Sequence, residues 1–309
     1  MENEPLIRWP QPILELLSFV STLLAIGAFG FRAIVMPRVV AAHPAGEERA
    51  ALDRAASRAA ALGLTGAAAG LIQILWRLPQ FAARRHVASL WLATHDPPTI
   101  VQLALALAAV AGFALALRRG WFGWTLSGVG VVAGTLRPAF FGRWPRLVNP
   151  VHELAGGMWI GTLFVLMTAG LSAVLRSELT SDRRGAVAAR LVNAFSPLAL
   201  SSAFVLAVFG VITAWRHLHR LEALWTTPYG YALITKLGLV LVVLALGAWN
   251  WRRQRPRLGG EDAARSLRQS ARAELAVAAL VLVITSVLVS LPEPREAPRS
   301  GRPAAAGRR

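Results

Sequence analysis

A histidine and a glutamate stand side by side where a long apolar stretch of the sequence begins. They are His152 and Glu153, and the stretch continues to about residue 175. Imidazole is the commonest ligand for copper, zinc and nickel, and a histidine beside a carboxylate suits divalent copper. An ionisable residue inside an apolar span is costly and indicates a function. The pair is therefore a candidate metal site. The structural alternative is a helix start, with Glu153 favoured by the helix dipole.

A tryptophan lies two helical turns beyond the histidine. At helical spacing Trp159 falls on the same face as His152, about 10 Å further along the helix axis. Gly157 and Gly161 form a pair of small residues four apart, which allows a neighbouring helix to approach closely. Trp159 is thus a candidate for a pathway beyond the histidine, and packing against a glycine face is its structural alternative.

A second pair of histidines lies between two later apolar stretches. His217 and His219 are separated by one leucine, so their side chains converge only if the chain is extended there, not in a regular helix. We treat both as candidate metal ligands. The alternative is that they are tolerated residues of an outer loop.

The single lysine of the chain, Lys236, lies about two turns inside another apolar stretch. Its side chain either reaches the polar lipid head groups or faces the other helices, where it could pair with Glu153. The sequence contains no cysteine, which excludes disulfides, thiolate metal ligands and a cysteine nucleophile. No nucleotide-binding loop, zinc-protease helix or nucleophile elbow is present, so we do not expect an enzyme.

The elements that must position these residues are membrane-spanning helices. Of the 309 residues 55% are hydrophobic, and the mean hydropathy is +0.50. We predict an all-α polytopic bundle of about eight transmembrane helices in the lipid bilayer, and we expect the eighth to be uniformly apolar. The apolar stretches lie near 12–36, 59–76, 100–117, 121–141, 150–175, 191–215, 230–251 and 273–291.

Arginine is distributed unevenly between alternate loops. One group of loops carries 17 arginines and the other carries 8, not counting five in the C-terminal tail. Because positively charged loops remain in the cytoplasm, the first group is predicted inside and both termini outside. This explains the net charge of +17 without nucleic acid as a partner. The arginine-rich group comprises 37–58, 118–120, 176–190 and 252–272.

The chain divides by its motifs into an N-terminal four-span segment, 1–141, and a second four-span segment, 142–292. Residues 293–309 are rich in proline, alanine and arginine and are predicted to be a disordered tail.

The second segment resembles the copper resistance protein D family of bacterial inner-membrane proteins over about 145–292. The resemblance rests on several motifs that follow one another in order: His152 with Trp159-Ile160-Gly161, Phe195-Ser196-Pro197-Leu198-Ala199, Thr227-Pro228-Tyr229-Gly230 with Lys236-Leu237, and Leu246-Gly247-Ala248-Trp249-Asn250 with Arg252-Arg253. Many members carry a further histidine near the outer end of the fourth span, where this chain has Gly134-Thr135-Leu136.

The resemblance implies copper handling at the bacterial inner membrane, usually uptake from the periplasm, beside a small periplasmic copper-binding chaperone of the copper resistance protein C type. From the residues themselves, and not from the resemblance, we predict that a copper ion would be held by His152, Glu153, His217 and His219. Two other functions remain open, a non-catalytic scaffold for assembling another membrane complex and a haem-binding electron-transfer protein. The last normally requires two axial histidines from facing helices, and only His152 lies within a predicted span.

Overall fold

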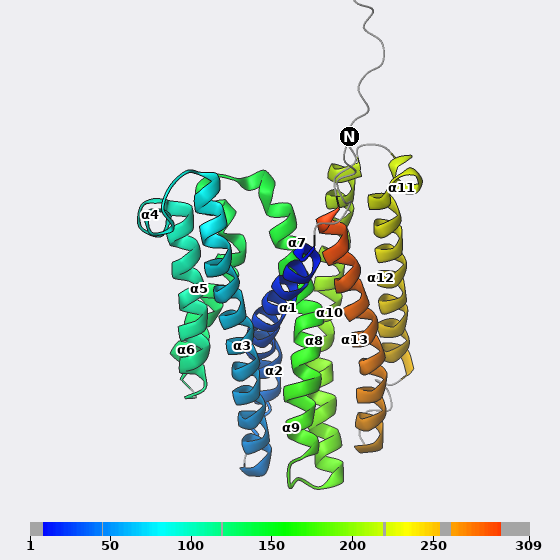
Figure 1. Cartoon of the computed structure of the whole chain (residues 1–309). Coiled ribbons are helices and arrows are strands. Elements are labelled where there is room, and N and C mark those ends of the chain that lie inside the picture. Colours follow the sequence, from blue (N-terminus) through cyan, green and yellow to red (C-terminus); the bar gives the residue numbers. More distant parts are fainter. Residues whose placement is uncertain (1–8, 45, 119, 219–220, 254–260, 292–309) are drawn as a thin grey trace, which may run out of the picture.

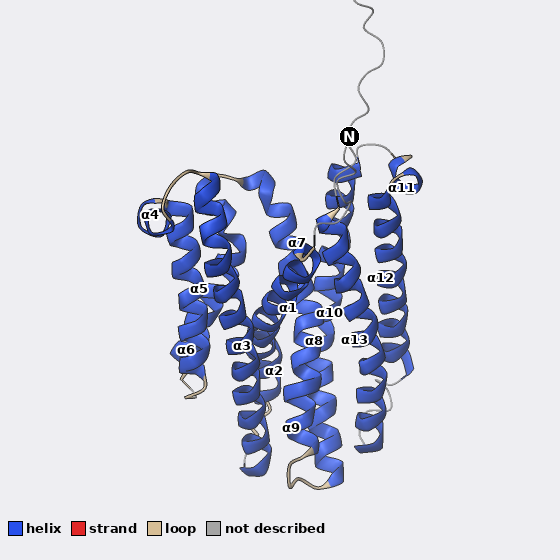
Figure 2. Ribbon diagram, in the orientation of Figure 1, coloured by secondary structure: helices blue, strands red, loops and turns tan. Residues whose placement is uncertain are grey.

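The structure, a computed structural model, describes all residues except 1–8, 45, 119, 219–220, 254–260 and 292–309. Figure 2 shows that every element in this part of the chain is a helix. The predicted all-α class is therefore confirmed. The predicted tail, 293–309, lies outside the described residues.

Short turns join most of the helices, and several long helices change their winding along their length. Their bounds in chain order are α1 Gln11–Gly30, η1 Phe31–Val35, α2 Met36–Val40, α3 Gly46–Arg84, α4 Ser89–His95, α5 Pro97–Ala116, α6 Trp121–Leu136, η2 Arg137–Phe141, η3 Trp144–Leu147, α7 Val148–Gly156, η4 Gly157–Gly161, α8 Thr162–Val165, η5 Leu166–Leu171, α9 Ser172–Leu175, α10 Ser181–Leu218, α11 Ala223–Thr226, α12 Pro228–Arg253 and α13 Glu261–Ser290.

Seven helical segments of the described chain are long and apolar enough to cross a membrane. They correspond to seven of the eight predicted stretches. The remaining stretch, 121–141, forms the 16-residue helix α6 followed by the short helix η2. At 1.5 Å per residue α6 is about 24 Å long, which is shorter than the hydrocarbon core of a typical bilayer.

The helices run alternately up and down between two ends of the molecule (Figure 1). In the orientation of Figure 1, α1 begins at the upper end, and α4, α11 and the start of α7 lie there too. The turn from α9 to α10 lies at the lower end. α13 finishes at the upper end, so the first and last described helices meet the same side of the molecule.

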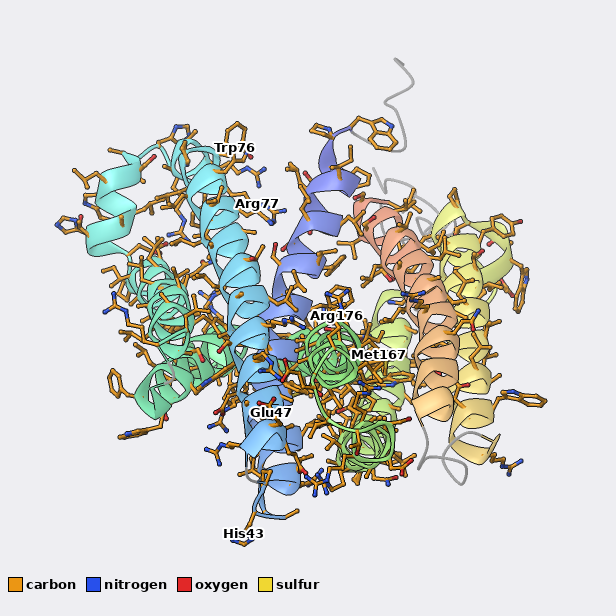
Figure 3. The ribbon with its side chains drawn as sticks, turned by 90° about the horizontal axis from the view of Figure 1, so that it is seen from below. His43, Glu47, Trp76, Arg77, Met167 and Arg176 are labelled. Carbon is orange, nitrogen blue, oxygen red and sulfur yellow. The ribbon has the colours of Figure 1, made fainter. Side chains whose placement is uncertain are left out.

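The segment from α7 to α9 is the centre of the bundle. Of its most apolar 18-residue window 72% is buried, against 11 to 33% for the other six spans. Figure 3 shows this segment, on which Met167 is labelled, with α3 on one side and α13 on the other. The other spans expose large apolar side chains such as Leu200, Phe204 and Leu241, as helices in contact with lipid do.

The predicted close approach at Gly157 and Gly161 is present, and the partner helix is α1. A Cβ atom on Gly157 would lie 2.7 Å from Cβ of Ile26. A Cβ atom on Gly27 would lie 2.7 Å from Cα of Gly161. Only residues without a Cβ permit two helix backbones to lie this close. One cluster of buried apolar residues then runs through both predicted segments, 1–141 and 142–292, because α1 packs directly on the central span.

Candidate functional site

His152 lies in the second turn of α7 and faces α10. Pro150 precedes it, in the first turn, where the missing N–H of proline is tolerated. The imidazole rests on Gly210, where an added Cβ would lie 3.2 Å from Cε1 of His152. The ring also lies near the Leu206 backbone of α10. Gly210 therefore provides the space that the imidazole occupies.

The Nδ1 atom of His152 is buried and has no hydrogen-bond partner among the described residues. Most buried polar atoms in proteins are satisfied, so an unsatisfied ring nitrogen requires an explanation. A neutral imidazole always keeps one ring nitrogen with a free lone pair, and that nitrogen can bind a metal. The buried Nδ1 of His152 is a candidate for that role.

Lys236 lies on α12, close enough to His152 for its ammonium group to act electrostatically on the imidazole. The side chain is half-buried, and no ion pair within 4 Å joins it to a carboxylate in the part of the chain that the structure describes. Lys236 is thus within electrostatic range of His152, and it forms no ion pair with Glu153.

Glu153 points to a different neighbour, since consecutive residues of a helix lie about 100° apart. Its carboxyl group lies near Thr22 and Glu15 of α1 and near Arg137 of η2. Glu15 in turn forms an ion pair of 3.1 Å with Arg77 of α3. These groups form a polar cluster between α1, α3 and α7, and the structure does not bring Glu153 together with His152 at one metal site.

Trp159 is buried within the π-helical segment η4. A π turn contains an extra residue, so the regular helical spacing used to align His152 with Trp159 ends at Gly157. The side chain belongs to the main apolar cluster of the bundle. A second π-helical segment, η5, follows in the same span, and such segments are often found at functional sites.

His217 lies in the last turn of α10, which remains helical through Leu218. It follows Gly210 by seven residues and so occupies the same face of α10, about 10 Å nearer the upper end. Between these levels the Thr213 hydroxyl donates a hydrogen bond of 3.1 Å to the side-chain oxygen of Asn149 on α7. The side chain of His217 and the whole of His219 lie outside the described residues.

The sequence analysis missed one buried ionisable residue. Glu274 of α13 is 7% exposed and accepts a hydrogen bond from the side-chain amide of Asn250 on α12, which is 6% exposed. The expectation that the eighth span is uniformly apolar was wrong, because Glu274 lies inside it. A signal was present, since a lone carboxylate in an apolar stretch is costly unless a partner helix supplies a donor.

The described residues contain no group of three or more histidine and acidic side chains that could hold a metal ion. His152 therefore supplies a single ring nitrogen in this part of the chain. Such a site could bind a soft or borderline metal only together with ligands from elsewhere, or only briefly during passage.

Comparison with known proteins agrees with the resemblance. Residues 189–288 match the family model described as copper resistance protein D. The match covers about a third of the chain, which is similar to copper resistance protein D over these residues. The matched segment contains His217, Lys236, Asn250 and Glu274, whereas His152 lies before it.

A curated relative agrees with the match to copper resistance protein D. The copper transport protein CutJ of Bacillus subtilis (strain 168) is 30% identical over 153 residues. The match covers 48% of this chain and 26% of the relative, so the chain spans about a quarter of that protein. None of the solved structures matches this chain.

Proposed function

We propose that this chain takes part in copper transport or homeostasis at a membrane, and that copper enters from the upper end of the bundle through His152. The observation that carries the proposal is the buried Nδ1 of His152, which has no partner among the described residues. The match to copper resistance protein D and the likeness to the copper transport protein CutJ support copper as the transported ion.

The positive charge of Lys236 near His152 favours transport of copper over storage of copper. The ammonium group of Lys236 repels a copper ion at His152, which weakens the binding. A transported ion must bind well enough to enter and weakly enough to leave. A single imidazole opposed by a nearby cation meets both conditions, whereas a full ligand set without the lysine would retain the metal.

The proposed copper route follows the face of α10 that contacts α7. We propose that His217 and His219 receive copper at the upper end, and that the ion then passes the Asn149–Thr213 contact to reach His152. Glu153, with its separate partners, would hold α7 against α1 and would not bind the metal.

The surroundings of the chain are part of the same proposal. The protein would lie in the bacterial inner membrane with its upper end in the periplasm, and α6 with η2 would complete the eight predicted spans. A periplasmic chaperone of the copper resistance protein C type would deliver copper to the upper end, as the resemblance implies. Direction of transport would be inward.

The alternative of a non-catalytic scaffold is less well supported, because a scaffold gives no reason to bury an imidazole nitrogen without a partner. A haem-binding protein is also disfavoured. In the seven spans found in the described chain, His152 is the only histidine, so paired axial ligands are missing there.

The test is the copper content and copper-dependent growth of His152→Ala. We expect this variant to lose at least about tenfold in copper affinity, since its ligand nitrogen is removed. His95→Ala is the matched control. His95 lies at the same end of the molecule but is exposed and stacked on Trp91, with ring centroids 5.4 Å apart.

A double variant, His217→Ala/His219→Ala, locates the site. If it loses copper while His152→Ala binds and transports as the wild type does, the site lies at the end of α10 and the proposed role of His152 is wrong. Full copper binding in all three variants would contradict the metal site altogether.

A further inference from the structure

A cavity of about 640 Å³ opens at the lower end of the bundle, opposite to His152. It lies between the end of the first span, the first turns of α3, and the hairpin of α5 and α6. His43, which lines it, is labelled in Figure 3. Its lining residues are Arg32, Met36, Pro37, Val40, Ala41, His43, Arg49, Asp53, Ala56, Ser57, Ala116 and Trp124.

The charges of this cavity do not balance. Arg49 pairs with Asp53 at 3.5 Å, and both belong to α3. Arg32 has no hydrogen bond or ion pair with any residue that the structure describes, and its guanidinium carbon lies 5.8 Å from the ring centre of Trp124. One half-buried positive charge therefore faces the cavity without an anionic partner at bonding distance.

The position of Arg32 is set by the winding of its helix. It belongs to η1, a π-helical segment between α1 and α2. A π turn redirects the side chains that follow it and is often found at functional sites. An arginine this near a span end could extend into the water. This one lies over the buried indole of Trp124 on another helix, within the cavity.

A cation is a poor ligand for this cavity, because Arg32 and Arg49 together outnumber Asp53. Among the described residues no group of three metal-binding side chains lies here. An anion is favoured, and phosphate in particular, because the planar guanidinium group matches its oxygen atoms. The remaining walls are mostly apolar, which suits a ligand with a hydrocarbon part: Met36, Pro37, Val40, Ala41, Ala56 and Ala116.

We propose that the cavity binds the phosphate group of a ligand with net negative charge, held by Arg32 with Arg49 beside it. Basic pockets between helices at the cytoplasmic face are typical binding sites for anionic lipid head groups. The phosphate would come from an anionic phospholipid of the adjacent leaflet or from a free phosphate ester. This inference does not depend on copper and stands or falls separately from the role of His152.

The test compares ligands on the purified full-length chain. Phosphatidylglycerol, phosphatidylcholine and glycerol phosphate are each added to the protein in detergent, and retained ligand is measured by native mass spectrometry. We expect phosphatidylglycerol to be retained at least about tenfold better than phosphatidylcholine, since only the first has net negative charge. Arg32→Met should abolish this preference, and Arg32→Lys should keep part of it.

Arg54→Met is the matched control, because Arg54 is an exposed arginine of α3 that does not line the cavity. Ala56→Leu keeps every charge and reduces the space, so it should also lower retention and tests the site if Arg32→Met fails to fold. Retention of phosphatidylglycerol alone identifies a lipid, and retention of glycerol phosphate as well identifies a free ester. Equal retention of the two lipids, or a preference that survives in Arg32→Met, would overturn the proposal.

Discussion

Two ionisable side chains with opposite effects on a metal ion lie within electrostatic range of each other, one on α7 and one on α12. His152 presents a buried ring nitrogen without a partner among the described residues, and Lys236 places a positive charge within electrostatic range of it. Charges act over longer distances inside a bundle than in water, because the effective dielectric constant is lower. The affinity of His152 for copper should therefore depend on Lys236 although the lysine is not a ligand.

Removing that charge while retaining the bulk of the side chain tests this dependence. Lys236→Met should bind copper about tenfold more tightly, equivalent to about 1.4 kcal/mol, and should transport it more slowly because release is impaired. Copper titration and uptake are measured on the same preparation.

Lys236→Arg keeps the charge and serves as the control for that titration. Wild-type affinity and wild-type uptake in Lys236→Met would show that the ammonium group reaches the lipid head groups and has no influence on the site.

At the scale of the elements, the central span determines how the bundle is packed. Its backbone approaches α1 at Gly27 and Gly161, and the Thr162 hydroxyl donates a hydrogen bond of 3.4 Å to the Gly27 carbonyl. Helices in lipid associate mainly by such close packing, because lipid chains are as apolar as the helices themselves. Contact between α1 and the central span therefore depends on the absence of side chains at these positions.

Adding one methyl group at Gly161 should push α1 and the central span apart. In Gly161→Ala the new Cβ would collide with the Leu23 carbonyl, and we expect a loss of about 1–3 kcal/mol in thermal unfolding of the detergent-solubilised protein. Gly238→Ala on α12 is the control, since no atom lies within 4 Å of its added Cβ. An unchanged unfolding temperature in Gly161→Ala would mean that α1 and the central span are not packed as described.

At the scale of the whole molecule, the two ends differ in charge. The arginine-rich loops of the described chain, including Arg176 at the α9–α10 turn, lie at the lower end, and His152 lies toward the upper end. By the positive-inside rule we predict that the lower end faces the cytoplasm and that the start of α1 and the end of α13 face the periplasm. The proposed copper route and the proposed phosphate site would accordingly open to opposite sides of the membrane.

Reporter fusions test this orientation. A reporter active only in the periplasm should be silent when fused after Thr180 and active when fused after Thr227, because these positions lie at opposite ends of α10. A fusion within 252–272 should be silent as well. The reverse pattern would place the upper histidines in the cytoplasm and would exclude copper uptake from the periplasm through His152.

Most of the fold follows from the sequence alone, because a bilayer requires about 20 apolar residues per span whatever the neighbouring helices are. Seven of the eight stretches were predictable for this reason, and the central position of the span that begins near His152 and the close approach at Gly157 and Gly161 also agree with the sequence. The direction in which each side chain faces was not predictable, because it depends on π turns and on helices distant in the sequence. Only the tertiary structure directed His152 to α10, turned Glu153 to α1, and paired Glu274 with Asn250 across two spans.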